Sequence, residues 1–128
     1  SEAPHTTKIV VVDSIGLLSV LYAKGKIAYV GGGFGAGIHN TLEPMAHNKP
    51  VIFGPAYSKF PEAVEMLRLK AARSVNSVQE LIDSIQFYKD SGHAEDAGKT
   101  ANDYMVRNAG ASAKVTKYLL ESIPYSAK

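Results

Sequence analysis

Five of the eleven glycines lie in one short loop, Gly31-Gly32-Gly33-Phe34-Gly35-Ala36-Gly37. The loop follows an apolar run at 27–30 and leads into a predicted helix that begins near Asn40. Glycine accepts a positive φ and lets a ligand approach the main chain, and a helix N-terminus presents free N–H groups to an anion. We therefore expect Gly33, Gly35 and Gly37 to line a phosphate site. The alternative is a tight strand-to-helix turn that binds nothing.

The spacing of the glycines in the loop argues against two classes of phosphate-containing ligand. Gly31–Ala36 satisfies the G-x-G-x-x-G/A pattern of dinucleotide sites, which also requires an acidic residue about 20 positions later, at the end of the next strand. That strand ends in Phe53-Gly54-Pro55, without an acid, which argues against NAD. The chain has no G-x-x-x-x-G-K-[ST] motif, which excludes NTPases of the P-loop class.

His39, Asn40 and Glu43 stand where the loop would enter the helix. A carboxylate there can accept both hydroxyls of a ribose, while His39 and Asn40 can donate to a phosphate or sugar oxygen. Asn40 and Glu43 also have the spacing of a capping box, in which they only satisfy helix N–H groups. His39, Glu43 and His47 recur every four residues, but the outer pair would lie about 12 Å apart along a helix, so we expect no metal site.

A second loop, Asp13-Ser14-Ile15-Gly16, also joins an apolar run to a predicted helix. In an open α/β sheet, ligands bind at the carboxyl ends of the strands. We therefore expect this loop, the glycine loop and Gly54-Pro55-Ala56-Tyr57 to meet at one edge of the sheet. The alternative for Asp13 or Ser14 is a helix N-cap without a ligand.

These loops must be positioned by short apolar runs, which are typical of strands covered on both faces. The runs span 9–12, 27–30, 51–53 and, more weakly, 72–75. Apolar residues with helical spacing separate them, so the pattern predicts an α/β domain with a Rossmann-like open parallel sheet flanked by helices. Three or four strands are few for this architecture, which usually has about six, so the chain is interpreted as part of a larger domain.

The predicted helices have apolar stripes at 15–22, 60–71, 78–85, 94–105 and 115–119. Gly25 would end the first of them and Pro61 would start the second. The final third of the chain is therefore helical, and Gly110 is predicted to break it before the last helix. No linker or repeat is visible, and residues 1–128 are expected to form a single domain.

Composition excludes several classes of function. The chain has 128 residues, a formal net charge of +2 and no cysteine. The small charge without a basic stripe argues against nucleic-acid binding, and the lack of cysteine excludes disulfides and thiolate chemistry. No apolar stretch reaches the ~18 residues of a membrane span, and Ser1–His5 does not resemble a secretory signal, so we expect a soluble chain.

Three segments together resemble the C-terminal domain of the 3-deoxy-D-manno-octulosonic acid (Kdo) transferases. They are Val30-Gly31-Gly32-Gly33-Phe34, Gly37-Ile38-His39-Asn40-Thr41-Leu42-Glu43-Pro44 and Pro50-Val51-Ile52-Phe53-Gly54-Pro55. The Asp13–Gly16 loop is similar to the preceding Asp-[Ser/Thr]-x-Gly loop of that family, and Asn108-Ala109-Gly110-Ala111 to the motif before its last helix. The chain departs from the family at Leu17, where many members carry Glu.

The resemblance implies a GT-B fold and an inverting glycosyltransferase that uses CMP-Kdo without an essential metal. Its acceptor would be a lipid A precursor of lipopolysaccharide synthesis, at the cytoplasmic face of the bacterial inner membrane. The acceptor surface, the membrane anchor and the catalytic base would belong to an N-terminal domain that this chain lacks. No catalytic residue is therefore expected here, and the chain alone should be inactive.

The resemblance also implies the binding residues. Ser14, Ile15 and Gly16 would line the nucleotide site, the Gly31–Gly37 loop with His39 and Asn40 would face the phosphate, and Glu43 would take the ribose. Two alternatives remain at this point: another GT-B enzyme that uses a UDP-sugar, and a non-catalytic α/β module whose glycines only make a turn.

Overall fold

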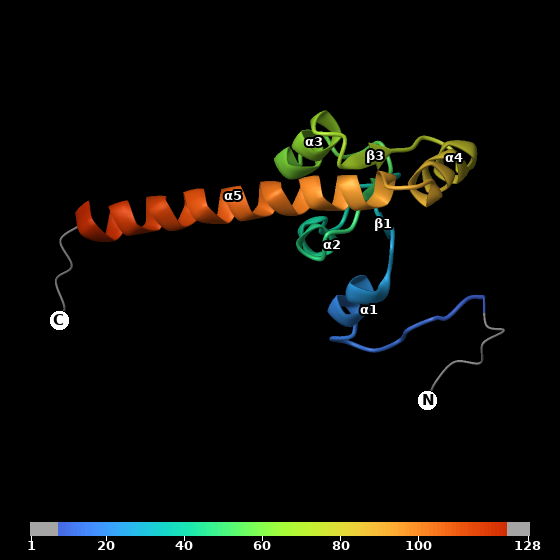
Figure 1. Ribbon diagram of the computed structural model, residues 1–128, viewed down its shortest axis with the longest axis horizontal. Coiled ribbons are helices and arrows are strands. Elements are labelled where there is room, and N and C mark those ends of the chain that lie inside the picture. Colours follow the sequence, from blue (N-terminus) through green and yellow to red (C-terminus); the bar gives the residue numbers. More distant parts are fainter. Residues whose placement is uncertain (1–7, 123–128) are drawn as a thin grey trace.

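The computed structural model describes residues 8–122, so the start of the chain discussed above lies outside the described residues. Five helices and three strands alternate along the chain (Figure 1). In order they are α1 (Leu18–Lys24), β1 (Ala28–Val30), α2 (Leu42–Ala46), β2 (Val51–Phe53), α3 (Pro61–Arg68), β3 (Ala72–Ser74), α4 (Val78–Lys89) and α5 (His93–Ser122).

The three strands form one parallel sheet in the order β1-β2-β3. Ala28 pairs with Val51, which pairs with Ala72, so each strand starts at the same level. The central strand β2 consists of Val51, Ile52 and Phe53, all of which are buried, as expected of a parallel strand covered on both faces. The predicted α/β class and the three strands near 27–30, 51–53 and 72–75 are thereby confirmed.

Side chains alternate across the sheet and divide the core into two clusters. Val51 and Phe53 point to the side that holds Met45 of α2 and Met66 of α3. Ile52 points to the other side, where it packs with Val75, with Tyr88 of α4 and with the first turns of α5. Pro61 occupies the first turn of α3 and Gly25 follows the end of α1, as predicted.

Helix α5 is longer than the sequence suggested, because the predicted break at Gly110 is wrong. The helix runs without interruption through Gly110, and nothing lies within 4 Å of the position that a Cβ on Gly110 would take. One glycine costs a helix about 1 kcal/mol but does not end it, and Ala109, Ala111 and Ala113 are strong helix formers. The second half of α5 extends beyond the body of the molecule (Figure 1).

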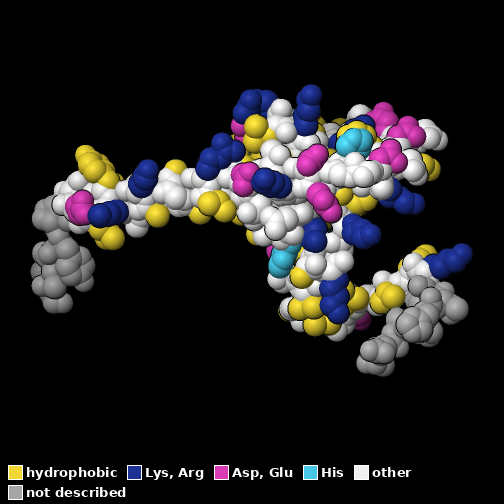
Figure 2. Space-filling view, viewed as in Figure 1, with side chains coloured by type: hydrophobic (Ala, Val, Ile, Leu, Met, Phe, Trp, Pro, Cys, Tyr) yellow, Lys and Arg dark blue, Asp and Glu magenta, His cyan; other side chains and the backbone are white. Residues whose placement is uncertain are grey.

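The strand predicted at 9–12 is also wrong: these residues form no regular element and lie away from the sheet (Figure 1). Ile9 and Val11 are more than four-fifths exposed. Among the described residues β1 pairs with β2 alone, so the other edge of β1 carries no strand. The apolar run at 9–12 is likewise exposed and has no strand beside it among residues 8–122, and Figure 2 shows hydrophobic side chains exposed around α1, the helix that follows this run.

Candidate functional site

The glycine loop and the Gly54–Tyr57 loop meet at the carboxyl edge of the sheet. The N–H of Ala56 donates to the carbonyl of Gly33 at 2.9 Å, and the N–H of Ile38 donates to the carbonyl of Ala56 at 3.3 Å. Gly33 and Gly54 touch through their backbones, because a Cβ on Gly33 would come within 2.5 Å of the Gly54 nitrogen. These two loops are brought together as the sequence predicted.

The glycine loop uses part of its own hydrogen-bonding capacity. The N–H groups of Gly35 and Gly37 both donate to the carbonyl of Gly32, at 3.0 and 3.4 Å. Gly32 and Gly37 have positive φ values of 86° and 143°, which favour glycine over other residues. The loop is therefore a folded turn in which Gly33 is buried, Gly32 and Gly35 are exposed, and Gly37 packs against the ring of Phe60.

His39 lies against this turn. Its N–H donates to the carbonyl of Gly31 at 3.0 Å, and a Cβ on Gly32 would meet the His39 ring at 2.9 Å. The side chain of His39 is exposed. An imidazole in this place can still offer a ring nitrogen to a ligand on the outer surface of the loop.

The predicted capping box of Asn40 and Glu43 is wrong in detail. Helix α2 begins one residue later than predicted, with Thr41 in the N-cap position. Asn40 nevertheless caps the turn, because its Oδ1 accepts from the N–H of Leu42 at 2.9 Å. The side chain of Thr41 makes no cap hydrogen bond, and its hydroxyl is buried without a partner. Since α2 has only five residues, the expected anion site shifts from the helix dipole to the side chains of His39 and Asn40.

Glu43 lies in the first turn of α2 and is half-buried. Helix α2 contacts α1, and burial of Tyr22 on α1, together with the nearby negative charge of Glu43, raises the pKa of Tyr22 above its usual value. Sequence reasoning assigned Tyr22 only to a core stripe. The structure instead places it against α2, with its ring centroid 6.4 Å from that of His47. A pair spaced 25 residues apart on two predicted helices gives no signal in a single sequence.

The structure does not bring the Asp13–Gly16 loop to the edge formed by the other two loops. Ser14 and Ile15 are exposed, and Ile15 is fully so. Gly16 has a φ of 91°, and nothing lies within 4 Å of the position that its Cβ would take. The loop precedes α1, which contacts the rest of the molecule through α2. Among the described residues, the structure therefore brings together the glycine loop, His39, Asn40 and Glu43, whereas the Asp13–Gly16 loop stands apart from them.

Comparison with known proteins finds relatives that are similar to most of this chain. No family model matches the chain. It is 35% identical over 117 residues to the 3-deoxy-D-manno-octulosonic acid transferase of Chlamydia pneumoniae, covering 89% of this chain and 27% of that protein. It is 32% identical over 124 residues to the enzyme of the same name from Haemophilus influenzae, covering 93% of this chain and 29% of that protein.

A solved structure agrees with the sequence matches. The C-terminal CMP-Kdo binding domain of WaaA from Acinetobacter baumannii aligns with a TM-score of 0.65 and 28% identity, over 73% of this chain and 51% of that one. The chain is homologous to the C-terminal part of the Kdo transferases. It spans less than a third of the length of these curated relatives and about half of the solved domain.

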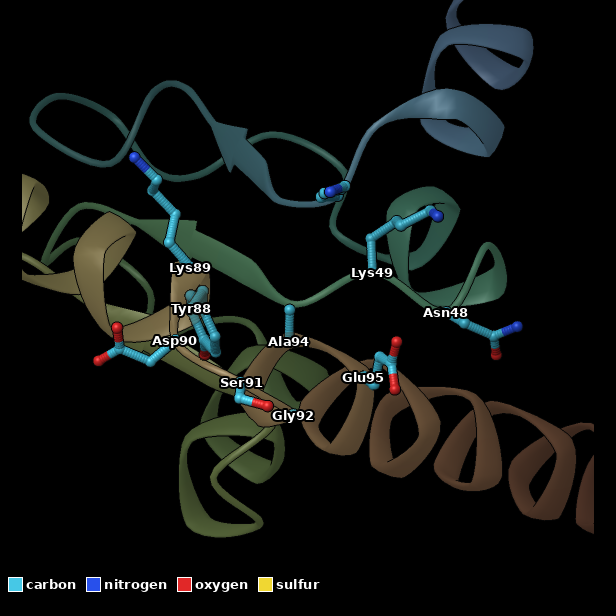
Figure 3. Close-up of a pocket in the computed structure, with 10 residues that line it drawn as sticks. Asn48, Lys49, Tyr88, Lys89, Asp90, Ser91, Gly92, Ala94 and Glu95 are labelled. Carbon is cyan, nitrogen blue, oxygen red and sulfur yellow. The ribbon is translucent and has the colours of Figure 1, made fainter.

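We also searched the described part of this Kdo transferase homologue for metal sites, membrane-spanning helices and cavities. Among residues 8–122, no cluster of three or more His, Asp or Glu side chains is arranged to hold a metal ion. The same residues contain no helix that is both long and apolar enough to cross a membrane. A cavity of about 440 Å³ lies at the opposite edge of the sheet, where Lys26 and Lys49 precede β1 and β2 (Figure 3). It contains none of the predicted site residues.

Proposed function

We propose that this chain is the donor-binding portion of an inverting glycosyltransferase of the GT-B type, which transfers Kdo from CMP-Kdo to a lipid A precursor. The observation that carries the proposal is the match to a CMP-Kdo binding domain, at a TM-score of 0.65 with 28% identity. The curated relatives that carry the name Kdo transferase favour CMP-Kdo over a UDP-sugar.

The geometry of the site fits the donor's chemistry. During transfer the departing CMP gains negative charge, and fixed donors stabilise that charge as it develops. The exposed side chains of His39 and Asn40 lie beside the glycine turn, where they can donate to the phosphate. Glu43 can accept hydrogen bonds from the ribose hydroxyls. We propose that these groups suffice without a metal. We also propose that Ser14, Ile15 and Gly16, which stand apart from these groups in this structure, bind another part of the same nucleotide.

The rest of the activity is proposed to lie in a further domain. A base that activates the acceptor hydroxyl must approach the sugar from the side opposite to CMP, so it would come from across a cleft. The lipid acceptor and contact with the cytoplasmic face of the inner membrane would belong to the same domain. The edge of β1, which is unpaired among residues 8–122, and the exposed apolar residues at 9–12 fit a donor domain with a larger sheet.

The decisive experiment measures nucleotide binding to the full protein that contains this chain. CMP should bind, and Glu43→Ala should weaken it by at least about tenfold, because a hydrogen bond to a charged group contributes about 1.5–3 kcal/mol. Glu62→Ala is the matched control, since Glu62 lies in the first turn of α3 and should leave the affinity unchanged. Displacement by UDP but not CMP would favour a UDP-sugar enzyme. Failure of both nucleotides to bind would favour the non-catalytic module.

A further inference from the structure

Helix α1 is joined to the rest of the fold by a small set of side chains. None of its residues is buried, and Leu18 and Val20 are half exposed. Among the described residues, one side-chain hydrogen bond joins α1 to the rest of the fold. It connects the Oγ of Ser19 with the Nε2 of His47 at 2.9 Å. The ring of Tyr22 adds a tilted contact with the same histidine, at 6.4 Å between centroids.

His47 stands on a rigid support. It follows the last residue of α2, and its N–H donates to the carbonyl of Pro44 at 3.1 Å. The neighbouring carbonyl of Ala46 accepts from the side chain of Asn102 on α5 at 3.3 Å. The carbonyl of Asn48 presses against Gly98, leaving no space for a Cβ there. The histidine is therefore anchored at the end of α2 and, through its neighbours, to α5, and it contacts α1 at Ser19 and Tyr22.

We propose that His47 is a positioning residue that, through Ser19 and Tyr22, fixes α1 and the preceding Asp13–Gly16 loop relative to Glu43. Ser19 lies three residues after Gly16, so restraining one restrains the other. Glu43, whose charge acts on Tyr22, and His47, which bonds Ser19, both lie beside α1. This inference rests on the proposed function, because the loop and Glu43 would bind two parts of one nucleotide.

The link does not require one tautomer of His47. A serine hydroxyl both donates and accepts, so the Ser19–His47 hydrogen bond forms with either a protonated or an unprotonated Nε2. The inference therefore predicts a loss on removal of the side chain and not a pH switch. It also separates the two contacts, since the hydrogen bond and the ring contact can be removed one at a time.

The test combines hydrogen–deuterium exchange with donor kinetics in the full protein. His47→Ala should speed exchange about fivefold in peptides that cover 13–24, because about 1 kcal/mol of local stabilisation is lost. Peptides that cover β2 and α5 should be unchanged. The KM for CMP-Kdo should rise about fivefold, while kcat stays within twofold.

Three further variants divide the role of His47. His47→Phe keeps a ring against Tyr22 and should restore part of the protection of 13–24. Ser19→Ala should reproduce part of the loss, and adding it to His47→Ala should cost less than the sum of the two. His93→Ala is the matched control: His93 bonds the carbonyl of Phe87 at 2.9 Å, so its loss should affect α4 and α5 but not 13–24.

Two results would overturn the inference, and a third, different result would overturn only its premise. Unchanged exchange at 13–24 in His47→Ala shows that His47 does not hold α1, whatever the nucleotide does. Faster exchange with an unchanged KM shows that α1 is held but that its position does not matter for the donor. If the wild-type protein binds no CMP, the proposed function fails, and the exchange result still decides whether His47 positions the loop.

Discussion

Gly33 and Gly54 approach each other so closely that neither can carry a side chain: a Cβ on Gly33 would lie 2.5 Å from the Gly54 nitrogen, and a Cβ on Gly54 would lie 2.6 Å from the Gly33 carbonyl carbon. The two residues follow the ends of β1 and β2. Their contact fixes the glycine loop on the sheet and so determines where His39 and Asn40 lie. The glycines of this loop thus serve the protein's own packing as well as any ligand.

Gly33→Ala should therefore destabilise the protein, and Gly35→Ala should not. An added methyl group in a tightly packed site costs about 1–3 kcal/mol, whereas a Cβ on Gly35 would meet its nearest neighbour, the Gly32 oxygen, at an ordinary 3.8 Å. Urea unfolding of the two variants measures the difference directly. Equal stability would mean that the Gly33–Gly54 contact is not as close as described.

The fold was largely predictable from the sequence, because β1 and β2 are short apolar runs separated by helical stripes, whereas β3, with the sequence Ala-Arg-Ser, gives only a weak signal. The role of each glycine was not predictable. In a sequence, a glycine that lets a ligand approach looks the same as a glycine that lets another backbone approach. Gly33 and Gly37 were expected to face a phosphate, and the structure shows that they also pack against Gly54 and Phe60.

The errors have a common physical origin in contacts that local patterns do not encode. The run at 9–12 has strand composition, but a strand needs a neighbour, and none is present among residues 8–122. Glycine at position 110 is typical of a helix break, but nothing packs against this position that would interrupt a continuous helix. Helix α2 begins after Thr41. The side chain of Asn40 accepts from the N–H of Leu42, two residues later, and not from that of Glu43, three residues later, as it would in the predicted capping box.

Two glycines of α5 should respond in opposite directions to the same substitution. Gly98→Ala places a methyl group against the carbonyl of Asn48, so α5 must shift from α2 and stability should fall by about 1–3 kcal/mol. Gly110→Ala adds a better helix former in open space and should stabilise by about 0.5–1 kcal/mol. Circular dichroism and thermal unfolding report both. A loss of helix in Gly110→Ala would contradict a continuous α5.

Tyr88 should make the protein sensitive to alkali. Its hydroxyl is buried without a hydrogen-bond partner, and burial raises the pKa of Tyr88 to about 12, although the charge of Arg73 opposes the rise. Because the folded pKa lies above the unfolded value near 10, the unfolded state loses its proton first. Stability that is fully present below pH 10 is therefore lost between pH 10 and 12, by about 2 kcal/mol.

Tyr88→Phe should remove this dependence. At pH 7 its free energy of unfolding should be at least that of the wild type, and up to about 1 kcal/mol higher, because the substitution removes a buried hydroxyl that has no hydrogen-bond partner. Tyr118→Phe is the control, since Tyr118 is exposed on α5. The comparison is the difference in urea midpoint between pH 7 and pH 11. A wild-type protein and a Tyr88→Phe variant that lose the same stability would show that Tyr88 titrates normally.

The side chain of Asn40 has two functions that one substitution can separate. Its Oδ1 caps the N–H of Leu42 at 2.9 Å, whereas its amide group is the proposed donor to the phosphate. Asn40→Asp keeps an oxygen for the cap but removes the donor and adds a negative charge. The free energy of unfolding should stay within about 0.5 kcal/mol, since Asp and Asn are equivalent N-caps, while CMP affinity in the full protein should fall at least about tenfold.

Asn40→Ala completes the comparison, because it removes both functions at once. It should cost about 1 kcal/mol of stability, the usual effect of a lost cap, and it should also weaken CMP binding. Calorimetric titration with CMP and urea unfolding of the same two variants give the four values that are needed. If Asn40→Asp bound CMP as the wild type does, Asn40 would only shape the start of α2, and the phosphate would depend on His39 and the loop backbone.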